Sequence, residues 1–340
     1  MKTEPYRVLL VDDRRQLADR AKGLFSNGTL APAGNGTTPE RMLEAVLQSK
    51  PNVIVLDVST DSAFAAIEDV MAQRPTPILV LHHGPKGGTD PFKALAMGAL
   101  DMAELPLQPT DAFWLAIARR LALLAQVRVV QHVRGKRKHR SRPVAAASGD
   151  GAAFPVVAIA ASLGGPKALA QLLSMVPREL AAPICICQHI SDGFTWGLSN
   201  WLASETGKHV VEARQDDPLE PGTIYVAPSR VHFRVEPPGK VWLDPSPPIQ
   251  GFRPSCDALL ESIAASFGRR AIGVILTGMG RDGALGLRAI RDRGGRTIAQ
   301  DESTCVVFGM PREAILLGAA EEVLPLEQIP ATLLRWVDEC

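Results

Sequence analysis

The sequence has almost no excess charge of either sign, since 37 lysines and arginines are set against 36 aspartates and glutamates, a formal net charge of +1 at pH 7. Such a chain lacks the strongly basic character typical of proteins that bind nucleic acids or membrane surfaces. No apolar run reaches the roughly 18–20 residues that span a bilayer, and the first residues lack the apolar stretch of a signal peptide. These absences predict a cytoplasmic protein with no nucleic-acid partner and no membrane insertion.

Cysteine is scarce and is not spaced for a metal. The chain has five cysteines, Cys185, Cys187, Cys256, Cys305 and Cys340. Cys185 and Cys187 are separated by one residue in an apolar run, which points both side chains to the same face of a predicted strand and matches no zinc motif. We expect reduced, structural cysteines; a nucleophilic role for Cys185 or Cys187 is the alternative.

The length of 340 residues favours two domains, each large enough to bury its own core. Residues 134–143 form a basic run, which small residues follow, and such a segment cannot bury enough apolar surface to become ordered. We predict a first domain at residues 1–127, a flexible basic linker at 128–152 and a second domain at 153–340. The linker could instead dock on an acidic protein surface.

The first domain alternates apolar strands with helical segments. Strands are predicted at 7–13, 53–57 and 77–82, and helices near 14–26, 38–49, 62–73, 89–97 and 110–125. This alternation predicts an α/β fold with a doubly wound parallel sheet. Because the ends of parallel strands meet at one edge, Asp12, Asp13 and Asp57 would form an acidic pocket able to hold Mg²⁺.

Residues 5–125 resemble the receiver domain of two-component response regulators, which has a flavodoxin-like sheet. The resemblance implies that Asp57 accepts a phosphoryl group while Asp12 and Asp13 help to hold the metal. The sequence departs from this pattern, because it has His82 in place of the switch Ser or Thr at the end of the fourth strand.

A second departure is Leu105, in place of the lysine that would neutralise the phosphoryl group. Without that lysine and the switch hydroxyl, the usual phosphorylation relay has lost two of its parts. We expect a degenerate receiver that serves for docking or inhibition; the alternative is a receiver that still accepts phosphate, with Mg²⁺ as its cofactor.

The second domain begins with a serine at the end of a strand. The apolar run 156–161 is followed by Ser162, then by Gly164, Gly165 and Pro166 at the start of a predicted helix. A serine in such a turn is exposed beside the free N–H groups of the helix start, which suits a nucleophile and a developing oxyanion. Alternatively, Ser162 only caps the helix while the glycines allow close packing.

Two further strand ends supply a base and a carboxylate. The strand at 183–188 leads to His189, and the strand at 271–276 leads through a glycine-rich turn to Asp282. In a parallel sheet both lie at the edge that holds Ser162, where His189 can act as general base and Asp282 can orient its imidazole. The alternatives are a structural histidine and an aspartate that caps a helix.

Six segments of the second domain carry a more specific resemblance. They begin at Ala161, Gln188, Ile224, Arg253, Leu276 and Gln300. In this order they look like the catalytic domain of the CheB family, the chemoreceptor glutamate methylesterases. The resemblance implies a Rossmann-like domain in which Ser162 is the nucleophile, His189 the general base and Asp282 the orienting carboxylate.

The same resemblance implies an oxyanion site. The Met279 N–H would be an oxyanion donor, and Leu163, Gly164 and Gly165 would line the pocket. Leu163 departs from the family, which usually has threonine at this position, and the change could alter the polarity of the pocket.

The implied activity is hydrolysis of γ-glutamyl methyl esters in chemoreceptor signalling domains, part of adaptation in a chemosensory pathway. Some members of the family also deamidate glutamine. The esterase needs no cofactor, and its implied partners are the methylated receptor and a chemosensory histidine kinase. The alternatives are a non-catalytic regulatory protein that binds receptor or kinase with the same two domains, and a nucleotide-binding protein that uses its glycine-rich turns.

Overall fold

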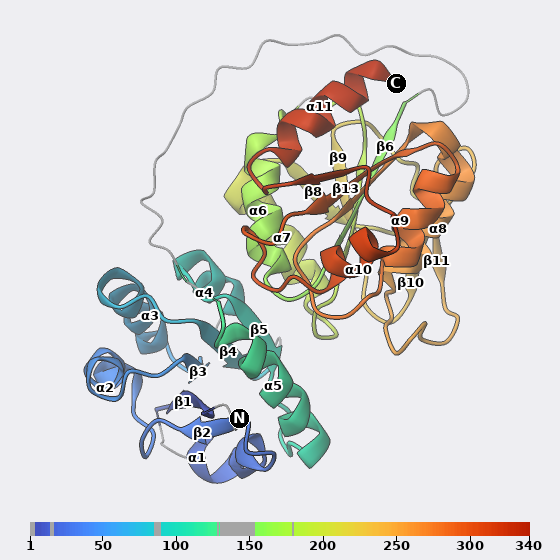
Figure 1. The fold of residues 1–340 in the computed structure, drawn as a ribbon. Helices are drawn as coiled ribbons and strands as arrows, with labels where there is room; N and C mark the ends of the chain where they lie inside the picture. The colour runs from blue at the N-terminus through green and yellow to red at the C-terminus, as the bar shows by residue number, and fades with distance from the viewer. Residues whose placement is uncertain (1–3, 14–16, 85–89, 128, 130–153, 179) are drawn as a thin grey trace. The chain divides into compact units, whose positions relative to one another are not determined.

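The computed structural model describes residues 4–13, 17–84, 90–127, 129, 154–178 and 180–340. They fall into two compact units on either side of residues 130–153, and both are drawn in Figure 1. Apart from Val129, the predicted linker 128–152 lies outside the described residues. No helix in the described ranges combines the length and the apolar character needed to cross a membrane.

The first unit is built on a parallel sheet of five strands in the order β2-β1-β3-β4-β5. Its strands are β1 (Tyr6–Val11), β2 (Leu30–Pro32), β3 (Val53–Asp57), β4 (Ile78–His82) and β5 (Asp101–Glu104). Its helices are α1 (Leu17–Arg20), η1 (Lys22–Phe25), η2 (Pro39–Arg41), α2 (Met42–Ser49), α3 (Ser62–Gln73), α4 (Pro91–Met97) and α5 (Asp111–Leu124). This strand order is that of flavodoxin-like sheets and confirms the predicted fold of this unit.

The predictions for this unit failed in two places. Where one helix was expected near 14–26, the described residues from 17 onward form the four-residue α1 and then the 3₁₀ helix η1. At this turn the backbone packs closely on α5, since a Cβ on Gly23 would lie 3.0 Å from Trp114 Cβ. The strands β2 and β5 were not among the predicted strands, because both are too short to show a periodic pattern.

The second unit has a parallel sheet of seven strands in the order β14-β13-β12-β6-β7-β9-β8, and a separate antiparallel pair, β10-β11. The strands are β6 (Val156–Ala161), β7 (Ile184–Gln188), β8 (His209–Glu212), β9 (Thr223–Val226), β10 (His232–Glu236), β11 (Lys240–Asp244), β12 (Ala271–Ile275), β13 (Arg296–Gln300) and β14 (Glu322–Leu324). The helices are α6 (Gly165–Met175), α7 (Thr195–Thr206), α8 (Cys256–Phe267), η3 (Gly268–Arg270), α9 (Ala284–Asp292), α10 (Met310–Leu316) and α11 (Ile329–Glu339).

The order of these strands creates a switch point beside β6. From β6 the chain continues to β7 on one side, and it later returns to β12 on the other side. Helices α6 and α7 lie on one side of the sheet, and α8 and α9 lie on the other (Figure 1). The loops after β6, β7 and β12 therefore diverge from the point where doubly wound sheets place their ligand sites.

Candidate active site

Ser162 follows β6 directly, in the predicted strand-to-helix turn. Its N–H donates to the Thr277 carbonyl at 3.1 Å, and its carbonyl accepts from the Gly165 N–H at 2.8 Å. The helix α6 begins at Gly165, with Pro166 in its first turn. The turn therefore fixes the backbone of Ser162 from both sides and leaves its side chain partly exposed.

Gly164 allows this turn to form. Its φ is 77°, in the left-handed region that favours glycine, and a Cβ at this position would lie 2.5 Å from Val306 Cβ. The glycine is required both by the backbone conformation and by the close approach of the neighbouring loop.

His189 is brought beside Ser162 by the register of β6 and β7. Ala161 pairs with Gln188, and the His189 N–H donates to the Ala161 carbonyl at 3.0 Å. Ser162 and His189 each follow the last residue of their strand directly, and Gln188 Nε2 donates to the carbonyls of both at 2.8 Å. The nucleophile and the base predicted from the sequence thus lie side by side.

Asp282 completes the arrangement. Its Oδ2 lies 2.8 Å from His189 Nε2, and the two side chains are 1% and 10% exposed, respectively. The Phe252 ring stacks on the imidazole with ring centroids 4.1 Å apart. Among the described residues His189 Nδ1 and Ser162 Oγ have no hydrogen-bond partner, so Nδ1 is the nitrogen left to receive the serine proton when Nε2 donates to Asp282.

The Asp282 carboxylate is held by the start of α8. It accepts hydrogen bonds from Ser255 Oγ at 2.7 Å, the Cys256 N–H at 2.7 Å and the Asp257 N–H at 3.1 Å. Burial raises the pKa of Asp282, but the hydrogen bonds from His189, Ser255 and Cys256 outweigh burial and hold this pKa below its ordinary value. The carboxylate is therefore charged and fixed in place.

The residues around Asp282 also shift the pKa of His189. Burial lowers the pKa of His189, but the neighbouring Cys256 sulfur and the Asp282 carboxylate outweigh burial and raise this pKa above its ordinary value. Burial also raises the pKa of the Cys256 thiol well above its ordinary value, so the thiol is uncharged at neutral pH. The carboxylate is the charge that acts on His189 under these conditions.

The predicted oxyanion residues differ in whether their N–H groups already have a hydrogen-bond acceptor. The Gly165 N–H is already engaged by the Ser162 carbonyl, whereas the N–H groups of Leu163, Gly164 and Met279 have no acceptor within the described residues. Met279 follows Gly278, whose added Cβ would lie 2.8 Å from Ser162 Cβ. The Met279 N–H is therefore on a turn that passes next to the nucleophile.

One positioning residue was missed by the sequence analysis. Gln188 is buried, and its Nε2 donates to the carbonyls of both Ser162 and His189 at 2.8 Å. It thereby joins the two strand ends that carry Ser162 and His189. The signal was present in the sequence as a polar residue at the end of an apolar strand, directly before His189.

The acidic residues of the first unit lie at the end of its sheet. Asp57 is the last residue of β3, and both of its carboxylate oxygens contact His83 Nε2, at 2.9 and 3.0 Å. Burial raises the pKa of Asp57 while His83 opposes this effect. Asp13 accepts a hydrogen bond from Ser59 Oγ at 3.1 Å, and Asp12 is buried nearby. These oxygen donors fit Mg²⁺, although His83 would have to release Asp57.

The two residues that depart from the receiver pattern, His82 and Leu105, have uncharged side chains. Leu105 is buried where the receiver lysine would be. His82 is buried too, and burial lowers the pKa of His82 to about 4, so it carries no charge at neutral pH. Neither side chain supplies the positive charge or the hydroxyl of a phosphorylated receiver.

The chain is similar to known proteins over nearly its whole length. A family model described as CheB methylesterase matches residues 157–333, a range that contains Ser162, His189 and Asp282. The protein-glutamate methylesterase FrzG of Myxococcus xanthus is 52% identical over 340 residues, which cover 98% of this chain and 99% of that protein. The protein-glutamate methylesterase/protein-glutamine glutaminase 2 of Anaeromyxobacter dehalogenans is 45% identical over 337 residues, which cover 97% of this chain and 96% of that protein. The crystal structure of the Thermotoga maritima CheB methylesterase catalytic domain matches with a TM-score of 0.53 and 39% identity, over 54% of this chain and 100% of that one.

Proposed function

Because this chain belongs to the CheB methylesterase family, we propose that Ser162, His189 and Asp282 are the nucleophile, general base and orienting carboxylate of its reaction. The chain is a protein-glutamate methylesterase, and its substrates are γ-glutamyl methyl esters of chemoreceptor signalling domains. The observation that supports these roles is the buried Asp282 bound to His189 Nε2, which leaves Nδ1 without a partner among the described residues, at a strand end that neighbours the one carrying Ser162.

The first half of the reaction forms an acyl-enzyme. Ser162 Oγ attacks the ester carbonyl while its proton passes to His189 Nδ1, and the charged Asp282 stabilises the resulting imidazolium. The N–H groups of Leu163, Gly164 and Met279 are the donors available to the oxyanion, since none has an acceptor among the described residues. The imidazolium then returns the proton to the leaving oxygen, and methanol departs.

The second half releases the product. Water replaces methanol, His189 takes a proton from it, and the hydroxide attacks the glutamyl ester of Ser162. Collapse of the second tetrahedral intermediate frees the γ-carboxylate of glutamate and restores the serine hydroxyl. The esterase step, as proposed, needs no metal or organic cofactor.

The triad roles are tested by replacing Ser162 with alanine in the full chain and measuring methanol release from methylated receptor. We expect turnover to fall by about 10³-fold or more, as for nucleophile removal in other serine hydrolases. Ser174→Ala is the matched control, since Ser174 lies on α6, is exposed and bonds only to the Ala170 carbonyl. Substantial turnover by Ser162→Ala would exclude this serine as the nucleophile.

The same site can also act on glutamine side chains. Attack of Ser162 on a carboxamide gives the same acyl-enzyme, with ammonia in place of methanol as the leaving group. Ammonia release from an unmodified receptor measures this activity, and Ser162→Ala should abolish both reactions together. Ammonia release that survives in Ser162→Ala would assign deamidation to a different group.

For the first unit we propose a degenerate receiver that serves to dock a partner or to inhibit the esterase, with a chemosensory histidine kinase as a candidate partner. The contact of His83 with both oxygens of Asp57 supports this proposal, as does the replacement of the receiver lysine by Leu105. If Mg²⁺ binds, oxygens of Asp12, Asp13 and Asp57 would hold it, and the ion would neutralise phosphoryl charge.

Incubation with a small phosphodonor and Mg²⁺, followed by intact-mass measurement, tests this role. We expect no phosphorylated species in the wild type. A phosphorylated species that disappears in Asp57→Asn would show instead that the receiver still accepts phosphate.

A further inference from the structure

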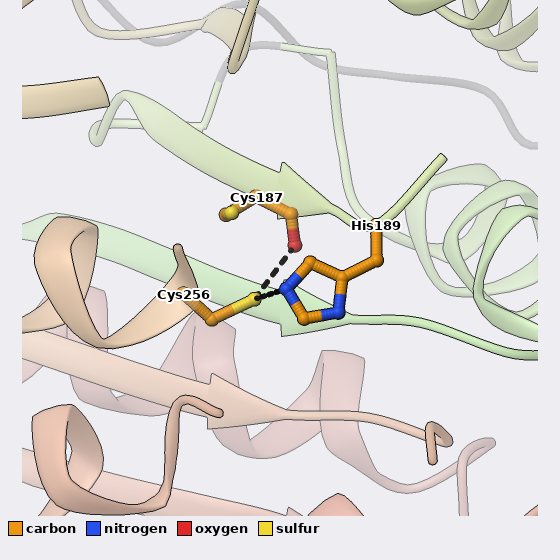
Figure 2. A group of neighbouring side chains, drawn as sticks. All are labelled: Cys187, His189 and Cys256. Atoms are coloured by element: carbon orange, nitrogen blue, oxygen red, sulfur yellow. Dashed lines mark hydrogen bonds between the residues drawn. The ribbon is translucent and has the colours of Figure 1, made fainter. Parts of the chain in front are cut away.

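Two cysteines lie beside the catalytic histidine (Figure 2). The Sγ atoms of Cys187 and Cys256 and a ring nitrogen of His189 all lie within 4.8 Å of one another. Cys256 Sγ is 3.6 Å from His189 Nε2 and 3.5 Å from the Cys187 carbonyl oxygen. Both cysteines are fully buried, whereas the His189 side chain is 10% exposed.

The fold explains why these residues meet although 69 positions separate the two cysteines. Cys187 lies on β7 and His189 directly follows the end of this strand, two residues later, a spacing that favours the same face of the sheet for both side chains. Cys256 is the first residue of α8, which packs against β6 and β7. One ligand set thus comes from a strand, the turn after it and a helix start.

We propose that Cys187, His189 and Cys256 form a binding site for Zn²⁺ or a similar thiophilic divalent cation. Zinc binds sulfur at about 2.3 Å and imidazole nitrogen at about 2.0–2.1 Å, so tetrahedral geometry separates S from N by about 3.6 Å and S from S by about 3.8 Å. The Cys256–His189 separation of 3.6 Å already matches this geometry. The two sulfurs need to approach by at most about 1 Å, within reach of a small side-chain rotation.

A divalent cation offsets the charge of the two thiolates. Zn²⁺ would displace the protons of the two thiols, so the dication balances both thiolates beside a neutral imidazole, and the remaining charge of Asp282 is stabilised by hydrogen bonds from Ser255 Oγ and from the N–H groups of Cys256 and Asp257. Asp282 Oδ2, 2.8 Å from His189 Nε2, is available as the fourth ligand. If it does not bind the metal, Asp282 keeps its hydrogen bonds from Ser255 and from the backbone of α8.

Metal binding would stop the proposed reaction, a consequence that rests on the proposed function. In the active form the Nε2 proton is donated to Asp282 and the Nδ1 lone pair accepts the Ser162 proton. A metal on Nε2 takes the lone pair of that nitrogen, so the proton of the neutral imidazole must reside on Nδ1. His189 then has no free lone pair and cannot act as the base.

The metal site is tested without activity by titrating the full chain with Co²⁺, a spectroscopic substitute for Zn²⁺. The titration uses a Cys340→Ser background to remove the exposed thiol. We expect thiolate-to-cobalt charge-transfer absorption that saturates at one equivalent, is lost in Cys187→Ala and Cys256→Ala, and is displaced by Zn²⁺. Cys185→Ala is the matched control, since Cys185 is equally buried on the same face of β7 but outside the cluster.

Each variant is compared by circular dichroism and melting temperature, so that unfolding is not mistaken for loss of a ligand. If Cys256→Ala unfolds, the contrast between Cys187→Ala and Cys185→Ala decides the matter. Absence of thiolate absorption in the parent chain, or equal absorption in Cys187→Ala, would overturn the proposed site.

Inhibition is measured as the ratio of turnover with Zn²⁺ to turnover with a chelator, within each variant. At saturation we expect this ratio to fall by about 10²-fold or more in the parent chain, the contribution of a general base, and to stay near one in Cys187→Ala. Cobalt absorption without inhibition would refute the regulatory consequence and leave the metal site standing. Loss of the proposed esterase function would leave the cobalt spectra unchanged, so the two failures can be distinguished.

Discussion

Ser255 connects Asp282, the proposed orienting carboxylate, to the helix that supports it. Its hydroxyl donates to Asp282 Oδ1 at 2.7 Å and accepts from the Ala258 N–H at 3.4 Å, as the N-cap of α8. The side chain is fully buried, so water cannot replace either bond. Replacement of Ser255 by alanine therefore tests whether the orientation of Asp282 matters for catalysis as well as for stability.

The two lost bonds set the size of the effect. A buried hydrogen bond to a charged group is worth about 1.5–3 kcal/mol, and an N-cap about 1 kcal/mol, so Ser255→Ala should lower the free energy of unfolding by about 2.5–4 kcal/mol. With one donor fewer, the pKa of Asp282 moves up and the carboxylate holds His189 less firmly. If the transition state of the hydrolysis also loses about 1.4 kcal/mol of stabilisation, turnover falls about tenfold.

Urea unfolding and methanol release measure the two effects separately. Ser262→Ala is the matched control: Ser262 is on the same helix, donates to the Leu259 carbonyl at 2.7 Å and accepts from the Val235 N–H at 3.0 Å, without contacting Asp282. We expect it to destabilise the protein while turnover stays within twofold or so of the parent, since the triad is untouched. Parent-like turnover in Ser255→Ala, or an equal loss in Ser262→Ala, would refute a positioning role.

Three further predictions concern the same site. In the presence of a chelator, kcat/KM should rise with pH above the ordinary imidazole range, because the base must be neutral and the pKa of His189 is raised. Asp282→Asn should move the midpoint of this rise to lower pH and reduce kcat by about 10⁴-fold. A midpoint that does not move would contradict the roles proposed for His189 and Asp282. Gln188→Leu removes the side-chain donor shared by the carbonyls of Ser162 and His189, so urea unfolding should show a free energy of unfolding lower by about 1–3 kcal/mol, and kcat should fall. An unchanged free energy of unfolding and an unchanged kcat would rule out a positioning role for Gln188. Gly278→Ala should lower kcat by about 10²-fold, because its Cβ would lie 2.8 Å from Ser162 Cβ, and a parent-like kcat would mean that this turn does not position the serine.

The main features of both units could be predicted from the sequence because their central strands are continuous apolar runs. Strands β3, β4, β6, β7 and β12 are buried along their whole length. A run of this kind identifies a central parallel strand, and its last residue marks the edge where sites form. The meeting of Ser162, His189 and Asp282 at one edge followed from this rule.

The supporting contacts could not be predicted in the same way. Ser255 reaches Asp282 across 27 positions, and Gln188 donates to Ser162 across 26 positions. Each contact depends on the direction of a helix start or on a side-chain rotamer, and neither leaves a periodic pattern in the sequence. The three-residue β2 escaped prediction for a related reason, because its conformation is set by packing and not by local propensity.

The cysteines show where spacing rules stop being informative. Zinc motifs are recognised in sequences when two ligands lie a few residues apart on one turn, and Cys185 and Cys187 do not satisfy that rule. In a doubly wound sheet, however, the relevant neighbours are residues on one face of a strand end and the first residue of the helix that packs on it. Cys187, His189 and Cys256 meet by this route. A fold that gathers the proposed nucleophile, base and orienting carboxylate from distant segments can therefore gather metal ligands around the same histidine, and the face of each strand is a better guide to them than the interval between cysteines.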